Sequence, residues 1–411
     1  DAWDGGDGCV TAIDPVDKHI IYYSRQHGDA MRLDESKDIA VSIKPILPKE
    51  IKDTLVFNYM TPYFLSTYDH KTLYQGGNYL MKSTDRGDTW QAISPNLGLS
   101  SLQEKKSVAA GTVVESPLSK GLLYVGTDHG AFWVSKNDGA TWEEQSTGIA
   151  SNYIRSISPS NHHLSRVYMA MTGINYDDLH SYVYVSEDYG KNWKSIAAGL
   201  PDEPVNVIKE GPKNENILYA GTMRGVFVST DRGSSWHYLG VNMPAAAVAD
   251  LEIHEGSQDL VVATHGRGIY KTNLKPIQQG LAQKLPREQD YLFEIDQVSR
   301  PWFNSSHGNV DYRTLQKVSF TYWLKEAKPV TLSVRDGANK EVWSTALNGS
   351  LGFNQFRWDL IVSKQESASP YFVHYDKFID SATYTLVLTT VEGSMQQKFK
   401  VVDGISPYLE N

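Results

Sequence analysis

The sequence lacks the features that mark several large classes of protein. It has one cysteine, Cys9, among 411 residues, so it can form neither an intrachain disulfide nor a cysteine-based metal site. No apolar run approaches the ~18 residues that a membrane-spanning helix needs. Basic residues are not in excess: the formal net charge is −9, which disfavours nucleic acid or an anionic membrane as a partner. No P-loop, HExxH or GxSxG motif occurs.

Helical periodicity is also missing, and an internal repeat stands in its place. A short apolar segment with an aromatic residue, followed by a Gly- or Thr-containing turn, recurs at intervals of 52, 50, 44, 51 and 42 residues. Its aligned positions are Tyr22, Tyr74, Tyr124, Tyr168, Tyr219 and Val261. About six units of this length are typical of propeller blades.

Each unit has the pattern of four short strands. In the fifth unit these are "VNVIKE", "ILYAGT", "GVFVS" and a strand that starts at the Trp of "WHYLG", separated by Gly, Pro, Asn and Asp. Short runs of β-formers bounded by such turn residues predict antiparallel strands. The sequence therefore predicts an all-β fold whose first part, residues 1–275, is a β-propeller.

Four units carry an eight-residue box of the form S-x-D-x-G-x-x-W between the third and fourth strands, at 83–90, 135–142, 186–193 and 229–236. The Ser and Asp side chains can bond to turn N–H groups, the Gly supplies positive φ, and we expect the Trp to pack over its own hairpin. The box residues are Ser83, Asp85, Gly87, Trp90, Ser135, Asn137, Gly139, Trp142, Ser186, Asp188, Gly190, Trp193, Ser229, Asp231, Gly233 and Trp236. The repetition indicates a structural rather than a catalytic motif.

These boxes resemble the Asp-box (BNR) repeats of sialidases, sortilin-type receptors, xyloglucan-cleaving hydrolases and photosystem II stability factors. The order "GGDG", "SPLSKGLLYVGTDHG" and "ATHGRGIY" is similar to bacterial sortilin-like propeller proteins that are often labelled glycosyl hydrolases, over about residues 5–275. The chain departs from the pattern at Asn137, in the degenerate "RLDESKD" of the first unit, and in the sixth unit, which has no box.

The resemblance has further implications. In that family the "GGDG" segment falls midway along a longer chain, which implies an upstream propeller segment of the same precursor and seven or more blades in the full protein. It also implies secretion to the exterior, the outer-membrane surface or the periplasm of a bacterium.

The C-terminal part has a different pattern. Residues 276–290 are polar with two prolines, as in a linker. Residues 291–411 contain about seven short alternating strands, which predict a β-sandwich. The order "VTLSVRDGANKEVW", "GFNQFRWDL" and "ATYTLVL" resembles immunoglobulin-like or fibronectin-type modules, which implies a non-catalytic role.

Candidate functional residues lie on the turns between second and third strands, because antiparallel order places them at the end of the propeller opposite the boxes. The loop of the fourth unit is expanded: Tyr168 and Ser186 are 18 residues apart, against 11 and 10 for the equivalent pairs in the third and fifth units. The binding candidates are Asn78, Asp128, His129, Asn175, Tyr176, His180, Arg224, His265 and Arg267.

Asp177 and Asp178 on the expanded loop are the candidate catalytic residues, because glycosidases use two carboxylates. Neighbouring residues seldom face one substrate atom together, so a solvated acidic loop is the favoured interpretation. His265 and Arg267 could bind an anion, but the glycines beside them favour a tight turn.

The sequence indicates neither a metal nor a cofactor. Asp1, Asp4 and Asp7 match a calcium loop only loosely. His162 and His163 have no third ligand nearby in the sequence.

Three functions remain open at this point. The favoured one is a non-catalytic, sortilin-like binding propeller with a protein or glycan partner. The second is a glycoside hydrolase whose cleft is completed by upstream blades, although the arginine motif of sialidases is absent. The third is an assembly factor for a membrane complex.

Overall fold

The structure is a computed structural model that describes residues 5–99, 108–239, 243–282, 289–304, 309–310, 316–366 and 374–404. The chain forms two compact units. One comprises Asp1–Trp236, Ala245–Glu255 and Leu260–Lys271, and the other His237–Pro244, Gly256–Asp259 and Thr272–Asn411. No helix in the described residues is long and apolar enough to cross a membrane.

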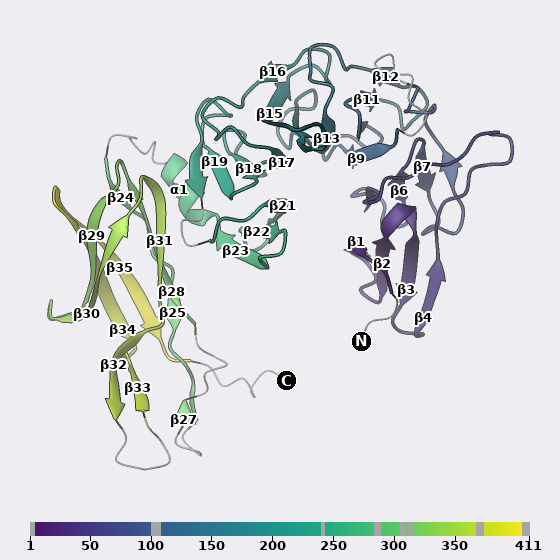
Figure 1. Ribbon diagram of the computed structural model, residues 1–411. Coiled ribbons are helices and arrows are strands. Elements are labelled where there is room, and N and C mark those ends of the chain that lie inside the picture. Colours follow the sequence, from purple (N-terminus) through teal and green to yellow (C-terminus); the bar gives the residue numbers. More distant parts are fainter. Residues whose placement is uncertain are drawn as a thin grey trace. The chain divides into compact units, whose positions relative to one another are not determined.

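The N-terminal half consists of successive small antiparallel sheets, as the repeat predicts (Figure 1). The first two are β1 (Gly8–Ile13), β2 (Ile20–Arg25), β3 (Ala30–Asp34) and β4 (Ile39–Ser42), then β5 (Tyr63–Leu65), β6 (Leu73–Gly76), β7 (Leu80–Ser83) and β8 (Gln91–Ala92). The third and fourth are β9 (Ala110–Glu115), β10 (Leu123–Thr127), β11 (Phe132–Ser135) and β12 (Glu143–Glu144), then β13 (Tyr153–Pro159), β14 (Val167–Gly173), β15 (Asp178–Ser186) and β16 (Lys194–Ser195).

The fifth sheet contains β17 (Val205–Glu210), β18 (Leu218–Thr222), β19 (Val226–Ser229) and β20 (His237–Leu239). The sixth has three strands, β21 (Val248–His254), β22 (Asp259–Thr264) and β23 (Ile269–Asn273). Five four-stranded sheets and one three-stranded sheet match the six expected units. The fold class predicted from the repeat, an all-β propeller, is therefore confirmed.

Successive sheets pack face to face through the first and second strands of each sheet. In the first five sheets the repeated tyrosine is buried, and the residue before it in the second to fifth sheets, such as Leu73 or Leu123, has no exposed surface. One residue of each pair faces the following sheet and the other the preceding sheet, because side chains alternate along a strand. The repeated "LY" or "VY" step therefore builds the core on both faces of a sheet.

The first sheet has one face that is not fully covered. Ile21 precedes the buried Tyr22 and pairs with Leu33 and Ile13 on neighbouring strands, so these three side chains lie on one face. Ile21 is half-buried and Ile13 is 58% exposed, whereas the equivalent Leu73 of the second sheet is fully buried. This face thus leaves apolar surface in contact with solvent.

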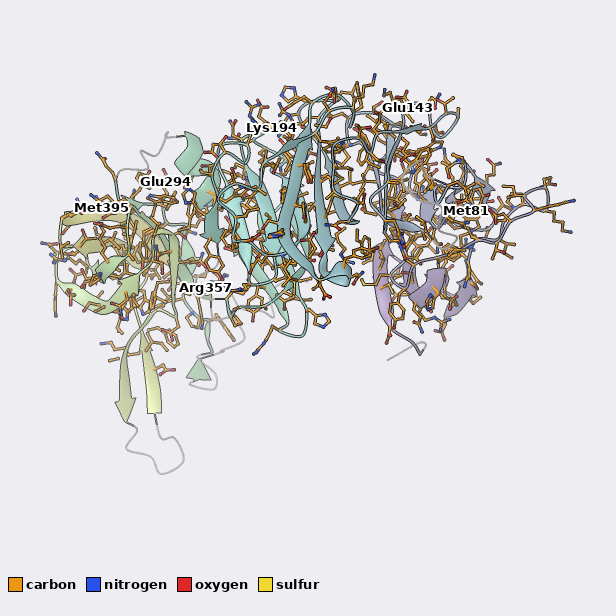
Figure 2. All side chains as sticks on the ribbon, turned by 45° about the horizontal axis from the view of Figure 1, so that its top comes forward. Met81, Glu143, Lys194, Glu294, Arg357 and Met395 are labelled. Carbon is orange, nitrogen blue, oxygen red and sulfur yellow. The ribbon has the colours of Figure 1, made fainter. Side chains whose placement is uncertain are left out.

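Strand direction defines two ends of these sheets. The end with the eight-residue boxes is called the box end below. The opposite end, with the turns between second and third strands, is called the loop end. Fourth strands such as β12 and β16 lie at the outer edge, where Glu143 and Lys194 are exposed (Figure 2).

The second unit holds the C-terminal strands. One sheet has the order β24 (Tyr291–Leu292), β28 (Val318–Leu324) and β31 (Gly352–Trp358). The other has the order β25 (Val298–Ser299), β35 (Gly393–Val402), β34 (Ala382–Thr390), β29 (Lys328–Arg335) and β30 (Glu341–Gly349). Two hairpins, β26 (Phe303–Asn304) with β27 (Asn309–Val310) and β32 (Ile361–Glu366) with β33 (His374–Phe378), complete it.

Both large sheets contribute to one apolar core, with Phe320 and Trp358 from one and Leu332 and Leu386 from the other. This is the arrangement of a sandwich. The expected linker at 276–290 overlaps helix α1 (Lys275–Ala282), and residues 283–288 lie outside the described residues. The division of the chain at residue 275 stays a prediction.

Candidate functional site

Each box folds into the same hydrogen-bonded turn. In the first box, Ser83 Oγ donates to Asp85 (2.7 Å) and accepts from the Gly87 N–H (2.8 Å). Asp85 also accepts from the Thr89 N–H (2.9 Å). Gly87 has φ +90°, and a Cβ there would lie 2.8 Å from Ile43 of the preceding sheet, so glycine is required. The other three boxes repeat these bonds.

The sequence suggested that the box tryptophan packs over its own hairpin, but each of the four also contacts the preceding sheet. Each indole N–H donates to a backbone carbonyl just beyond the fourth strand of the sheet before it. The pairs are Trp90 with Ile43 (2.9 Å), Trp142 with Ile93 (2.7 Å), Trp193 with Gln145 (3.2 Å) and Trp236 with Ile196 (2.8 Å). The boxes therefore join successive sheets.

At the loop end, the first candidates have structural partners. Asn78 is buried; its Oδ1 accepts from the Val56 N–H (2.8 Å) and its Nδ2 donates to the Thr54 carbonyl (3.0 Å), which fixes the connection after the first sheet. Asp128 lies 2.6 Å from His129 Nδ1, and its N–H donates to Ala109. Asn78 is thus unavailable to a ligand, while Asp128 and His129 pair with each other.

The expanded loop of the fourth sheet forms the end of the hairpin β14–β15. Asp178 accepts hydrogen bonds from Asn152 Nδ2 (2.9 Å) and Tyr182 Oη (2.8 Å). These bonds, with the Asn152 bond foremost, lower the pKa of Asp178, and the same carboxylate raises the pKa of Tyr182 to about 12. Asp177 is exposed and in the left-handed region at φ 57°. Asp178 is held ionised by its partners, which does not suit a general acid.

The tip of this hairpin is apolar and exposed. The short turn Ile174–Tyr176 contains Asn175, and the exposed fractions of Ile174, Tyr176 and Leu179 are 42%, 50% and 56%. His180 follows and pairs with Asp202 (2.9 Å), which raises the pKa of the imidazole. The loop end therefore presents three apolar side chains beside an exposed, protonatable His.

The remaining candidates lie on the fifth and sixth sheets. Arg224 Nε pairs with the buried Glu203 (2.9 Å), whose Oε1 has no hydrogen-bond partner among the described residues. His265 and Arg267 are exposed on a turn in which the Thr264 N–H donates to the Gly268 carbonyl (3.2 Å). This turn bond agrees with the tight-turn interpretation of that segment.

The acidic N-terminal segment is only partly described. Asp1 and Asp4 lie outside the described residues. Asp7 accepts a hydrogen bond from the Tyr59 hydroxyl, and its N–H donates to Gln26. In the described part of the chain, no three His, Cys, Asp or Glu side chains lie close enough together to hold a metal ion.

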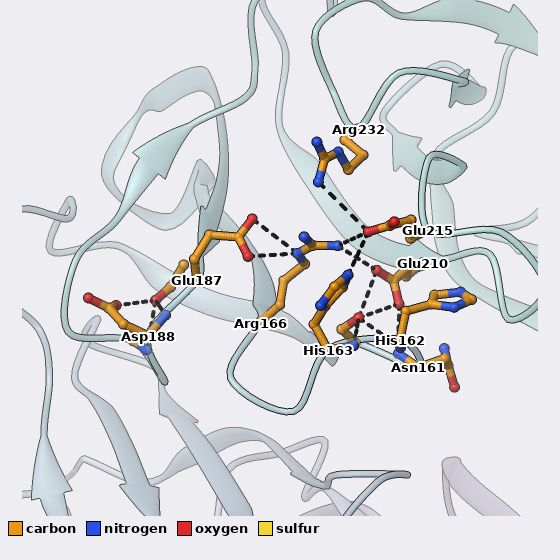
Figure 3. A network of polar contacts seen from close by, with 12 residues as sticks. Asn161, His162, His163, Arg166, Glu187, Asp188, Glu210, Glu215 and Arg232 are labelled. Atoms are coloured by element: carbon orange, nitrogen blue, oxygen red, sulfur yellow. Dashed lines mark hydrogen bonds and ion pairs between the residues drawn. The ribbon is translucent and has the colours of Figure 1, made fainter.

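The sequence analysis missed a polar network at the box end (Figure 3). Arg166 is nearly buried; its Nε pairs with Glu187 (2.8 Å) and its Nη1 with Glu215 (2.7 Å). His163 Nε2 also lies 2.8 Å from Glu215. Burial alone would lower the pKa of Arg166, but the bonds to Glu215 and Glu187 raise it. The hydrogen bonds that Glu215 accepts, from Arg166 first and then from His163, lower the pKa of its carboxyl to about 2.

A buried acid adds a second tie between the same two sheets. Glu210 has no exposed side-chain surface, and its carboxylate accepts from Ser160 Oγ (2.8 Å) and the Asn161 N–H (2.6 Å). His162 Nε2 bonds the Gly211 carbonyl (2.9 Å). The pair His162 and His163 therefore joins the fourth sheet to the fifth. Two features of the sequence could have indicated this network: the adjacent histidines, and the acids that lie nine residues before two of the repeated tyrosines, Glu115 and Glu210.

Comparison with known proteins gives one partial family match. Residues 181–281 match the model of the family described as Sortilin-Vps10: Sortilin, neurotensin receptor 3. None of the curated proteins matches the chain.

Three solved structures that are similar to the chain share 11–14% identity with it. One is YCF48 bound to a D1 peptide (13% identity, 71% of this chain and 85% of that one, TM-score 0.42). PorZ, a surface component of the type-IX secretion system of Porphyromonas gingivalis, shares 11% identity (97% and 52%, TM-score 0.45). A GH74 xyloglucanase from Xanthomonas campestris shares 14% (94% and 58%, TM-score 0.47). The chain thus spans little more than half the length of the latter two, and its residues 181–281 are similar to sortilin.

Proposed function

We propose that this chain is part of a non-catalytic binding propeller that holds a protein or peptide partner at its loop end. The observation that carries the proposal is the apolar tip of the β14–β15 hairpin. Ile174, Tyr176 and Leu179 expose about half of their surface there. Exposed apolar groups that gather on one loop typically mark a protein-binding site. The family match begins at residue 181, just after these three residues, and does not include them.

The polar groups near the tip suit recognition better than hydrolysis. A glycosidase needs two carboxyl groups in different protonation states on either side of a bond. Asp178 is occupied by Asn152 and Tyr182, while Asp177 points from an exposed turn. His180, which follows Leu179 and is paired with Asp202, supplies a polar contact beside the tip. An apolar centre with a polar rim is typical of protein interfaces.

The proposal includes a larger assembly at the bacterial surface. Ile13 and Ile21 lie on the half-open face of the first sheet. Ile21 is the equivalent of Leu73, which lies on a buried face of the second sheet. An upstream propeller segment of the same precursor would bury this surface as the first sheet buries Leu73 of the second. A single cysteine is compatible with a cytosolic protein and with a secreted one that does not rely on disulfides, so the proposed secretion rests on the resemblance to bacterial sortilin-like propeller proteins.

The test compares two variants of the chain in pull-downs from an envelope extract of the source bacterium. The double variant Tyr176→Ala, Leu179→Ser removes the apolar tip. Leu164→Ser, on an exposed turn at the box end, is the matched control. We expect a stoichiometric partner that wild type and Leu164→Ser retain and the double variant loses. A partner retained equally by all three proteins would place binding elsewhere.

A parallel assay addresses hydrolysis. Wild type and the variants Asp177→Asn and Asp178→Asn are incubated with neutral and acidic polysaccharides and with sialosides, and released reducing sugar is measured. We expect no release from any substrate. Release that either Asn variant abolishes would contradict the proposal and assign the expanded loop to catalysis.

A further inference from the structure

A groove of about 470 Å³ opens at the box end between the fourth and fifth sheets. Its walls come from the third and fourth boxes and from the strands beside them, and include Asp188, Trp193, Asp231 and Arg232. It lies at the opposite end of the sheets from the β14–β15 tip and is independent of the proposed function. Its volume falls within the roughly 300–1,000 Å³ of small-molecule sites.

At this junction the fourth residue of the box has a different kind of partner from its counterparts. At the three earlier junctions this residue contacts the preceding sheet, either at one of its strands or boxes or at the turn that follows the first strand of that preceding sheet. The pairs are Arg86 with Asp14 (3.0 Å), Asp138 with Lys82 (2.6 Å) and Tyr189 with Lys136, whose Nζ lies 4.8 Å from the ring centre. At the last junction Arg232 instead turns towards Glu215, a residue of its own sheet's turn, at 3.7 Å (Figure 3). The space beside Trp193 therefore stays open.

The lining combines an apolar wall with balanced charge. Tyr168, Ile196 and the half-buried Trp193 supply the apolar part. Among the polar residues, Asp188 and Asp231 are fixed by the bonds within their boxes, so their oxygens are rigidly placed. Arg232 and the exposed Lys194 offset these two carboxylates, and Arg166 neutralises Glu187. The lining thus holds three carboxylates, one of them paired with Arg166, and two cations, so it presents charges of both signs rather than the single sign that would select an ion.

We propose that this groove binds an uncharged, hydroxyl-rich ligand, a short segment of a neutral oligosaccharide. A sugar ring has apolar faces that pack against aromatic side chains, and hydroxyl groups at its edge that both donate and accept hydrogen bonds. The groove offers Trp193 for the first, and Asn192, Lys194 and Ser234 for the second. An extended peptide is less well matched, because β16 is only two residues long and offers almost no strand edge.

The experiment measures binding of cellohexaose, xylohexaose and maltohexaose to the whole chain by saturation-transfer NMR and calorimetry. The main variant, Arg232→Tyr, gives this box the residue that fills the preceding junction. Tyr at this position is compatible with the backbone, since Tyr189 has φ 64° and Arg232 has φ 56°. Tyr189→Phe is the matched control, and Ser234→Trp is a second way to fill the groove should Arg232→Tyr not fold.

We expect at least one hexasaccharide to bind, Tyr189→Phe to leave its affinity unchanged, and each groove-filling variant to weaken it by about tenfold or more, equal to about 1.4 kcal/mol. Absence of binding for all three sugars would overturn the proposal, as would binding that the groove-filling variants leave unchanged. A charged hexapeptide that binds instead, and loses affinity in Arg232→Tyr, would also overturn it and make the groove a peptide site. None of these outcomes depends on the partner of the loop end.

Discussion

The box tryptophan is best understood as a residue of the junction between sheets. Its indole N–H bonds a carbonyl of the preceding sheet, while its ring packs against that sheet, as Trp193 does edge-on against Phe132 at 4.9 Å. A backbone carbonyl that loses such a donor is left unsatisfied in a partly buried site, which costs more than the bond itself contributes. The same eight letters are therefore repeated because each junction needs the same contact.

Replacement of Trp236 tests this role. Trp236→Phe keeps an aromatic ring but removes the donor to Ile196, and we expect unfolding of the propeller to become easier by about 1–3 kcal/mol. Trp133 is the control, because its indole nitrogen is buried without a hydrogen-bond partner in the described part of the chain. Trp133→Phe should therefore cost less than Trp236→Phe in urea unfolding followed by circular dichroism. Equal costs would mean that ring volume, rather than the hydrogen bond, dominates.

Asn137 shows how one box tolerates a different residue. Its Oδ1 accepts from the Thr141 N–H (2.9 Å), as Asp85 does from the Thr89 N–H. The second contact is reversed: Asp85 accepts from the Thr89 hydroxyl, whereas Asn137 Nδ2 donates to Thr141 Oγ1 (2.9 Å). The hydroxyl of Thr141 can rotate to reverse this bond. We expect Asn137→Asp to change stability by no more than about 0.5 kcal/mol. Asn137→Ala removes these two bonds and also the bond that Asn137 Oδ1 accepts from Ser135 Oγ (3.1 Å), and it should cost about 1–2 kcal/mol in thermal melts of both variants and wild type.

At the scale of the elements, the repeat predicted strands well and their connections less well. The tyrosine step and the boxes mark β10, β11 and their equivalents because short alternating segments encode buried strands locally. The Arg166 network was missed because its partners Glu187 and Glu215 are 21 and 49 residues away in the sequence. Asn78 was a binding candidate by position, yet its amide is used to hold a connection that only the folded chain brings near.

The Arg166 network predicts a dependence of stability on pH. Folding lowers the pKa of Glu215 from about 4.3 to about 2. The contribution of the ionised Glu215 carboxylate to the free energy of unfolding is therefore complete above about pH 4.3 and is lost as the pH falls towards 2. Glu215→Gln should therefore melt below wild type at neutral pH, and the difference should shrink between about pH 4 and pH 2. Thermal melts across this range measure it. Glu35→Gln, at an exposed turn, is the control and should melt close to wild type at neutral pH.

At the scale of the molecule, the sequence predicted the number of sheets but not which faces are covered. Periodicity shows that Ile21 and Leu73 have the same place in their units, and nothing local distinguishes them. Their burial differs because a preceding sheet packs on Leu73, while the face of Ile21 is half-open. The candidate site was predicted in the same way: the expanded loop was visible in the spacing, but the pairing of Asp178 required the fold.

The two equivalent positions allow a direct comparison. Leu73→Ala creates a cavity between the first and second sheets and should cost about 2–5 kcal/mol. Ile21→Ala removes side-chain volume from a half-open face and should cost clearly less in this chain, because solvent already contacts the site. Urea unfolding of both variants at two protein concentrations checks this. Equal costs at both concentrations would contradict the open face. A cost of Ile21→Ala that rises with concentration would mean that a second copy covers it, since only association depends on concentration.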